Sequence, residues 1–524
     1  MDPGVIDAVQ RIAQLEYERD EYKKLVRLLQ EENERLKRGL LGQKAERLPA
    51  NDLQLSFAIL NLMLSGDSAA PDATEAPAPP DSEQVIGEHK RRKPKRKALP
   101  IDAPRVPIEI IPPEVQREGL DAFELVGTDV REVLERRPAS TVVVQLIYKK
   151  FVRKDRPRNA PTQVLCPETV ELPIERGLAG PGMLADTIVR RWQDHQPLNR
   201  LEDIYAREGL DLAKSTMCTW HEALADLARP LVDAMRQEAL AEPYLCVDAT
   251  GVLVQAKEKC RAGHFWVLVA PEKHVLYGFS KQHNAAAVDE LLGGYQGYLV
   301  ADAHAVYNHL YEGGDVIEVG CWAHARRYFF KSLASDPERA KVALSHIGAL
   351  FRIERTIADS PRNKKEQVRR AKSRPIVDKF FDWCEVEAER VLDESPLSTA
   401  IGYARNQRVA LHRFLDDGRL PLSNNISELH LRREVLGRKN WLFVGSDEAA
   451  LVNTVFVSLL ASARMHRLDP QVYLRDLFCL LPSWPKHRLL ELAPVYWQKT
   501  LEQPEAQQRL DSNVFRRVLH SPPS

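Results

Sequence analysis

The strongest constraint on the fold is a run of alternating apolar segments in the middle of the chain. Three strand-like runs at residues 244–256, 263–270 and 274–280 are separated by turn residues or short charged connections, which predicts an antiparallel meander. Helical and strand-like segments then alternate, so we expect an α+β domain built on a mixed sheet. These later segments are a helix at 285–292, a strand at 298–301, a helix at 303–311 and a strand at 316–320.

Three carboxylates stand out against this pattern. Asp248 and Asp302 each end an apolar strand, and Glu428 lies in the first turn of a predicted helix. Hard divalent cations prefer oxygen ligands, and two such ions can activate an attacking oxygen and stabilise a leaving one during phosphodiester cleavage. An aspartate at a strand end is also a common turn or cap residue, and Asn425 with Glu428 fits a helix capping box. The pattern therefore indicates either metal-dependent chemistry on nucleic acid or three structural carboxylates.

The order of these carboxylates on this topology is typical of a ribonuclease H-like domain, and two further motifs make a specific resemblance. They are Gly-Cys-Trp-Ala-His-Ala-Arg-Arg-Tyr at 320–328 and Gly-Arg-Lys-Asn-Trp-Leu-Phe-Val-Gly at 437–445. With them, the chain resembles the DDE transposases of the insertion sequence 66 family over most of its length. Further matching stretches are residues 38–47, 197–209, 458–464 and 468–474.

The resemblance implies a DNA transposase that binds the ends of an insertion sequence and catalyses DNA cleavage and strand transfer. It implies that Asp248, Asp302 and Glu428 are the catalytic residues and bind two Mg²⁺ ions, with Mn²⁺ as a substitute. DNA and accessory proteins of the same element are the implied partners. Family members usually carry an aspartate and an arginine where this chain has Ser423 and Leu429. Two alternatives stay open: a catalytically decayed transposase that only binds DNA and dimerises, and a related nuclease without strand transfer.

Cys321, His324 and Arg327 belong to a family signature whose role the resemblance leaves undefined. A zinc site would need a second pair of ligands, and none lies nearby in the sequence. His324 fits contact with a DNA phosphate, orientation of a carboxylate, or a place in the core near a strand end. A zinc-binding segment is not expected ahead of the helical region, because residues 100–165 contain no cysteine.

The N-terminal region carries signals for assembly and for non-specific DNA binding. Residues 1–48 show a heptad repeat with Asn33 at an a position, which predicts a coiled coil and a homodimer or higher oligomer. An amphipathic helix packed on its own protein is the alternative. Residues 49–99 are expected to be a linker with a basic run that binds DNA phosphates without reading bases, or that is simply solvated. The run comprises Lys90, Arg91, Arg92, Lys93, Lys95, Arg96 and Lys97.

Two regions flank the expected catalytic core. Residues 100–180 are predicted to be a small β-rich region. Residues 181–240 are predicted to form short helices, either a helix-turn-helix-like unit with Thr216, Thr219 and His221 facing DNA, or a plain helical support for the core. The expected core comprises 241–330 and 416–460, interrupted by an all-α insertion at 331–415 and followed by a helical tail at 461–524.

Basic residues lie near the expected site and within the expected insertion. In the insertion, the basic runs 362–365 and 369–374 either hold DNA or form a solvated helix face. Trp441 and Phe443 are expected to pack on the core rather than stack on a base. The side chains expected to contact the scissile strand are Arg432, Arg433, Arg438, Lys439 and Asn440.

Composition places the chain among large globular proteins of the cytoplasm. Its 524 residues exceed what one core normally supports, and 44% are hydrophobic. Seven scattered cysteines favour reduced thiols over a disulfide framework. We expect no run of about 18 apolar residues and no signal peptide, hence no membrane and a cytoplasmic, nucleoid-associated location. Lys and Arg total 74, equal to Asp and Glu, so overall charge says little about DNA binding.

Overall fold

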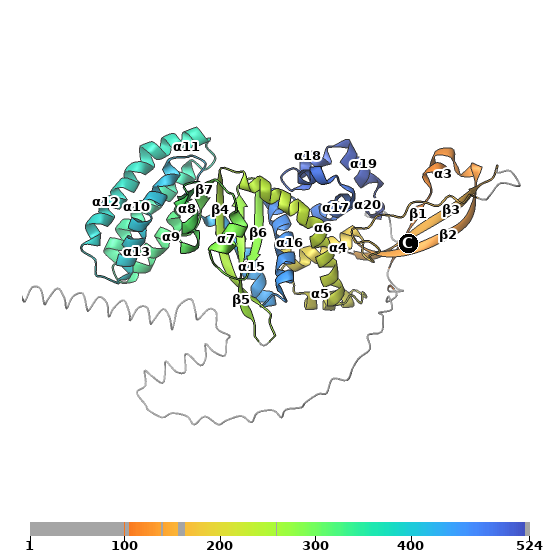
Figure 1. Cartoon of the computed structure of the whole chain (residues 1–524), viewed down its shortest axis with the longest axis horizontal. Helices are drawn as coiled ribbons and strands as arrows, with labels where there is room; N and C mark the ends of the chain where they lie inside the picture. Colours follow the sequence, from red (N-terminus) through yellow and green to blue (C-terminus); the bar gives the residue numbers. More distant parts are fainter. Residues whose placement is uncertain (1–98, 100–103, 138–139, 156–162, 258, 519–524) are drawn as a thin grey trace, which may run out of the picture. The chain divides into compact units, whose positions relative to one another are not determined.

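The computed structural model describes residues 99, 104–137, 140–155, 163–257 and 259–518 (Figure 1). These residues form two compact units: a mixed α+β unit made of the chain up to residue 323 and from residue 409 onward, and a helical unit at 324–408. The predicted coiled coil and the basic run lie outside the described residues. The predicted multi-domain α+β class is confirmed.

A five-stranded sheet with the order β6-β5-β4-β7-β8 forms the centre of the larger unit. The first three strands form the predicted antiparallel meander, β7 pairs parallel with β4, and β8 pairs parallel with β7. Leu245, Cys246 and Val247 of the central strand are completely buried, which explains why this strand reads as a continuous apolar run. The elements are β4 (Tyr244–Val254), β5 (Arg261–Ala270), β6 (His274–Ser280), α7 (Ala285–Leu292), β7 (Gly297–Val300), η4 (Ala305–Tyr307), α8 (Asn308–Glu312) and β8 (Val316–Val319), so the predicted strands and helices are confirmed.

Helix α16 (Asp447–Met465) covers the backbone of the edge strand β6. The Tyr277 N–H donates to Ser458 Oγ at 2.8 Å, and the Val275 N–H donates to Ser462 Oγ at 3.0 Å. Ser462 Oγ in turn donates to the Val275 carbonyl at 3.0 Å. An open edge would leave such groups unpaired and able to pair with another chain, so the two serines close this side of the sheet.

Helix α16 is also long and apolar enough to cross a membrane, the one such helix among the described residues. The helix is not an unbroken apolar run, because it includes Asp447, Glu448, Asn453 and Arg464, so the expectation that no such run exists stands. In addition, 72% of its apolar window is buried inside the protein, and its serines bond to β6. Its apolar character is explained by its place in the core.

Residues 181–240 form the predicted helices and pack on the sheet. They are α4 (Pro181–Ile188), a π-helical turn η3 (Val189–Gln193), α5 (Leu198–Arg207) and α6 (Lys214–Leu240). His221 on α6 is buried, its Nε2 lies 3.0 Å from Thr187 Oγ1, and its ring packs on Trp192. His221 therefore does not face DNA, as one of the two alternatives for this region would require. Because α6 contacts β5, β6 and α16, it supports the sheet.

A second, three-stranded sheet forms within residues 104–153, with the order β1-β3-β2. Phe515 and Val518, near the end of the described chain, belong to the hydrophobic cluster on this sheet. The elements of this sheet are β1 (Arg105–Ile110), α3 (Pro113–Glu118), η2 (Leu120–Ala122), β2 (Phe123–Arg137) and β3 (Ser140–Arg153). The C-terminal elements are α17 (Pro470–Leu480), η8 (Leu481–Ser483), η9 (Lys486–Leu492), α18 (Trp497–Leu501), α19 (Pro504–Ser512) and α20 (Val514–Val518).

The unit at 324–408 is helical throughout. Its core includes Phe329, Phe380 and Phe381, whose rings pack edge-on against one another. Arg369, in one of the basic runs, is buried and pairs with Glu354, so it is unavailable to DNA. The elements are α9 (Trp322–Lys331), η5 (Ser332–Ala334), α10 (Pro337–Thr356), α11 (Arg362–Val368), η6 (Arg369–Ser373), α12 (Arg374–Ala388) and α13 (Pro396–Asn406), with α14 (Arg408–His412) and η7 (Arg413–Leu415) following.

A buried carboxylate joins β2 to the first turn of α4. Glu135 is buried, its Oε1 accepts a hydrogen bond from the Arg136 backbone N–H at 2.7 Å, and the backbone N–H groups of Met183 and Gly182 act on the same carboxylate. A Cβ at Gly180 or Gly182 would overlap the carboxylate, so both positions require glycine. Burial raises the pKa of Glu135 to about 8, against the opposing effect of these N–H groups and of Arg475.

The raised pKa of Glu135 predicts a pH-dependent stability. The folded state binds a proton more tightly than the unfolded chain, whose carboxyl pKa is near 4.5, so this stabilisation is present at low pH and is lost as the pH rises through about 8. Between pH 5 and pH 8 the loss amounts to about 3 kcal/mol. We expect Glu135→Gln to remove this component, as measured by urea unfolding at both pH values. Glu124→Gln, at an exposed position on the same strand, is the control; equal pH slopes for the two variants would contradict the assignment.

Candidate active site

Asp248 and Asp302 lie at matching positions on adjacent parallel strands. Cys246 of β4 pairs with Val300 of β7, and each aspartate follows its paired residue by two positions. Because side chains alternate along a strand, and neighbouring strands lie about 5 Å apart, this register directs both aspartates to one face of the sheet, just beyond the last paired residues of β4 and β7. Both carboxylates, together with the dominant effect of burial, raise the pKa of the Tyr307 phenol well above its ordinary value. The two aspartates therefore share one neighbour, Tyr307.

Glu428 lies in the first turn of α15 (Asn425–Trp441), and that turn is attached to the strand carrying Asp248. The buried Asn424 side chain donates from Nδ2 to the Val247 carbonyl at 2.8 Å. Ser427 Oγ donates to Asn424 Oδ1 at 2.7 Å. The N-cap residue is thus Asn424, and the predicted capping box with Asn425 at that position is wrong. The Asn424 side chain bonds to the sheet and does not cap the N–H groups of the helix.

Cys321 supports the same junction. Its buried thiol accepts a hydrogen bond from the Asn424 backbone N–H at 3.2 Å. The neighbouring Trp322 donates from its backbone N–H to the Leu422 carbonyl at 3.1 Å and from its indole Nε1 to the Leu411 carbonyl at 2.9 Å. The first part of the 320–328 motif therefore holds the segment that leads into α15. His324 and Arg327 of the same motif belong to the helical unit.

The carboxylates have the right chemistry for a magnesium site, but too few of them lie close together. Aspartate oxygens on neighbouring strands are the ligand type that Mg²⁺ prefers. Among the residues that the structure describes, however, no three His, Cys, Asp or Glu side chains gather closely enough to hold a metal ion. Asp248 and Asp302 therefore offer two carboxylates on neighbouring strands, and Glu428 follows Asn424, which bonds to β4, without forming a group of three. The same finding gives no support to a zinc site at Cys321 and His324.

Three histidines beside Asp302 were not predicted from the sequence. The His283 ring lies 5.1 Å from that of His264 and 4.5 Å from that of His304, and it stacks on Trp266 at 4.9 Å. Burial lowers the pKa of His283, as do His304 and His264, whereas Asp302 opposes the shift. The only available signal was His304, two residues after Asp302, because the other two come from β5 and the segment after β6.

The basic residues after Glu428 divide into structural and exposed side chains. Arg438 donates from Nη1 to Thr250 Oγ1 at 2.9 Å and also to the Gly251 carbonyl, so it ties α15 to β4. Burial lowers the pKa of Arg433, which bonds to Gln193. Arg432, Lys439 and Asn440 are exposed. Of these basic and amide side chains, Arg432, Lys439 and Asn440 are therefore the ones accessible to a partner.

The aromatic residues at the end of α15 differ from each other. Trp441 is partly buried and packs against a hydrophobic cluster that includes Val444, which confirms the packing part of the prediction. Phe443 is 41% exposed, so the expectation that it packs on the core is wrong. The reason is a tight turn at Leu442 that directs the chain away from the helix axis.

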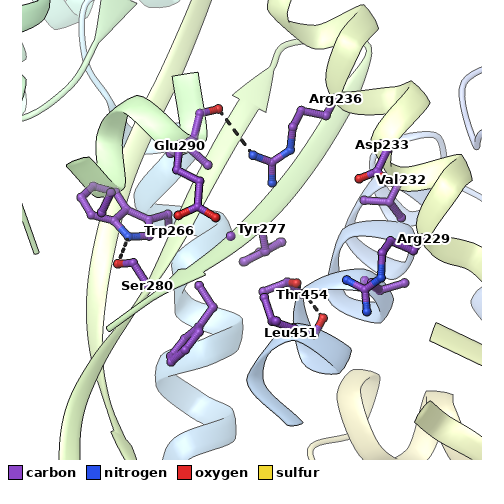
Figure 2. Close-up of a pocket in the computed structure, with 15 residues that line it drawn as sticks. Arg229, Val232, Asp233, Arg236, Trp266, Tyr277, Ser280, Glu290, Leu451 and Thr454 are labelled. Carbon is purple, nitrogen blue, oxygen red and sulfur yellow. Dashed lines mark hydrogen bonds between the residues drawn. The ribbon is translucent and has the colours of Figure 1, made fainter. Parts of the chain in front are cut away.

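A small cavity of about 110 Å³ lies between α6, α7, α16 and strands β5 and β6 (Figure 2). Arg236 Nη1 donates to the Leu291 carbonyl at 3.5 Å, and Trp266 Nε1 donates to Ser280 Oγ at 2.8 Å. Burial lowers the pKa of Arg236, and Asp233 and Glu290 oppose this shift. None of the three candidate carboxylates lines this cavity, so it is separate from the candidate site.

Comparison with known families identifies the class of protein as a transposase. The family model described as "Transposase IS66 family" matches residues 176–451, more than half of the chain. Models described as "Transposase C of IS166 homeodomain" and "IS66 C-terminal element" match residues 28–108 and 458–495. The chain belongs to the IS66 transposase family.

Three related proteins of Sinorhizobium fredii (strain NBRC 101917 / NGR234) match nearly the whole chain. "Uncharacterized protein y4hP" is 29% identical over 499 residues, which cover 89% of this chain and 88% of that protein. "Uncharacterized protein y4qI" is 28% identical over 483 residues, with coverage of 88% and 87%. "Uncharacterized protein y4jD" is 25% identical over 511 residues, with coverage of 93% and 98%. The similarity thus extends beyond any single domain.

The two neighbouring asparagines allow a matched test of the helix attachment. We expect Asn424→Ala to lower the free energy of unfolding by about 2 kcal/mol, because it leaves the buried Val247 carbonyl without its amide partner. Asn425→Ala should change stability by less than about 0.5 kcal/mol, since Asn425 is exposed. Urea unfolding of both variants measures the difference, and equal effects would refute the role of Asn424.

Proposed function

We propose that this chain is the transposase of an insertion sequence, and that it cleaves the ends of the element and joins them to target DNA. The observation that carries the proposal is the register that brings Asp248 and Asp302 to one face of the sheet, with the first turn of α15 attached to β4 through Asn424. This arrangement lies within the segment that matches the IS66 transposase family.

We further propose a ribonuclease H-like catalytic core made of residues 241–330 and 416–460. Its support is the three-stranded meander followed by two strands that extend the sheet in parallel from β4. In this proposal the helical unit at 324–408 is an insertion between Asp302 and Glu428. The helix carrying Glu428 then returns to the strand of Asp248 through Asn424.

Asp248, Asp302 and Glu428 would hold the Mg²⁺ ions, which Mn²⁺ could replace. When bound, these ions supply activation of an attacking oxygen and stabilisation of the leaving one. Asp248 and Asp302 provide the negative charge that attracts the cations, and Asn424 orients the turn that brings Glu428 toward them. Arg432 and Lys439, both exposed on α15, would contact phosphates on either side of the scissile bond.

The remaining parts of the proposal concern assembly and location. Residues 1–48 would form a coiled coil that pairs two copies, which suits an enzyme that holds two DNA ends. The basic residues at 90–97 would add sequence-independent affinity for DNA. We also propose a cytoplasmic location, association with the nucleoid when bound to DNA, and cooperation with accessory proteins of the same element.

A decayed transposase that only binds DNA is the second candidate. It is favoured by Leu429, which is 59% exposed where family members usually carry an arginine, and by the lack of a gathered three-ligand set among the described residues. A nuclease without strand transfer would differ only in the joining step.

Cleavage and joining of labelled DNA that carries the element's own ends test the proposal. We expect the intact chain, with Mg²⁺ and its accessory proteins, to cut and join. Asp248→Asn, Asp302→Asn and Glu428→Gln should each lower both activities by more than about 100-fold, the upper range for a residue that merely supports a metal ligand. Binding to the ends should persist in all three variants.

Asp315→Asn, at an exposed position beside β8, is the matched control and should keep full activity. Binding without cutting by the intact chain would establish the decayed transposase. Cutting without joining would establish the nuclease.

A further inference from the structure

A pocket of about 500 Å³ lies at the far end of β4 and α15 from the candidate carboxylates. It is lined by residues of η3 and the start of α6, by Gln255 just after β4, and by the turn from α15 to α16. The volume falls in the range of ligand pockets in proteins. Of the described lining residues, Asn440 is the one expected from the sequence to contact the scissile strand, and no function has been assigned to the pocket itself.

Two indole rings and a guanidinium form one part of the pocket lining. The Arg191 guanidinium carbon lies 5.6 Å from the Trp441 ring centroid and 5.9 Å from that of Trp192. Trp192 is held in place by its packing on His221 and Phe456. Rigid aromatic faces next to a cation are a common platform for nucleic-acid bases, because every base has a π face.

Among the residues that the structure describes, three buried polar atoms of the pocket lining have no hydrogen-bond partner. They are Arg191 Nη1 and Trp192 Nε1, which are donors, and Asn453 Oδ1, which is an acceptor. Buried polar groups are normally paired, so three orphans around one pocket indicate an occupant with complementary atoms. A base edge carries such a mixture of acceptors and donors.

The wall formed by the α15–α16 turn is strained. Leu442 has φ 64° and ψ −49°, and the Phe443 N–H donates to the Trp441 carbonyl at 2.8 Å, which closes a γ-turn of the rare positive-φ type. Val444 then bonds in both directions with the end of β4, through Leu253 and Gln255. Such strain persists only where the surroundings enforce it, and it concentrates at ligand sites. Leu442 and Phe443 remain exposed at the pocket.

We propose that this pocket binds a single unstacked base of the DNA end, with Trp441 as the stacking face and Arg191, Trp192 and Asn453 as hydrogen-bonding groups. A base within a duplex is stacked on both sides and cannot enter such a pocket, so the nucleotide must be extruded or single-stranded. The inference rests on the proposed action on DNA ends.

The position of the base follows from the strand that joins the two sites. Asp248 and Val254 are six residues apart on β4, or about 20 Å. Nucleotides are spaced about 3.4 Å apart along a stacked strand. The captured base therefore lies about six nucleotides from the phosphodiester at Asp248.

Abasic scanning of the element's terminal-repeat DNA tests the proposal. Affinity of the full chain is measured by fluorescence anisotropy with Ca²⁺ in place of Mg²⁺, on ends in which one nucleotide at a time lacks its base. We expect Trp441→Ala to weaken binding of the intact end by about tenfold, the usual effect of losing one base–aromatic stack. On the end that is abasic about six nucleotides from the cleavage point, the same substitution should change affinity by less than about twofold.

Further variants separate loss of the stack from loss of the fold. Trp441→Phe keeps an aromatic face and should bind the intact end better than Trp441→Ala, and Arg191→Ala should reproduce the dependence on the same abasic position. Phe330→Ala, which removes an exposed aromatic ring in the helical unit, should show no such dependence.

Two results would overturn the proposal, and they differ in what they say of the transposase assignment. If the intact chain binds the ends, and Trp441→Ala weakens binding by the same factor on the intact end and on every abasic end, the base pocket alone is refuted. No binding of the ends or of single-stranded oligonucleotides by the intact chain would refute the pocket and the action on DNA together.

Discussion

The larger unit depends on one buried hydrogen bond between the Asn424 side chain and the Val247 carbonyl. These residues are 177 positions apart in the sequence, with the whole helical unit between them. An amide buried without a partner is costly, so the bond strongly favours a single placement of the first turn of α15. Cys321 adds a contact from its buried thiol to the Asn424 backbone. A long insertion is tolerated because the entropic cost of closing a loop rises slowly with its length. The bonds of Asn424 then fix the position of α15 against β4.

The second constraint is the closure of the sheet. Strand β6 would be an open edge, and α16 satisfies its backbone groups with the hydroxyls of Ser458 and Ser462. Such a helix must be apolar on most sides, because it is buried between β6 and α6. Its resemblance to a membrane span is a consequence of that burial. The same helix contributes Asn453 to the pocket at the end of β4, so closing the sheet also builds a candidate ligand site.

Sequence patterns predicted the helices and strands well, but they predicted less well which single side chains are buried or exposed. The β4–β8 strands were predictable because buried strands are short apolar runs between turn residues. Phe443 was misjudged, and the patterns left open whether His221 and Arg369 face DNA, since burial depends on which other element packs above a residue. Arg369 looked like part of a basic surface, yet Glu354 on another helix pairs with it in the interior. The sequence pattern predicted Asn425 as the helix N-cap. It could not show that Asn424 occupies this position, because the side chain of Asn424 bonds to the Val247 carbonyl on a strand far away in the sequence.

By itself, the sequence determined the alternation of strands and helices and the placement of Asp302 just after a strand, because both follow from local apolar patterning. Asp248 was expected at a strand end but lies within β4, because that strand continues to Val254. The sequence also carried enough of the family motifs to identify the IS66 family. Only the tertiary structure decided that Cys246 pairs with Val300, that Asn424 holds α15 to β4, and that three histidines gather beside Asp302. The same is true of the pocket between Arg191 and Trp441. These features depend on strand register and on contacts between segments far apart in the chain, and a one-residue change of register would turn every side chain of a strand to the other face.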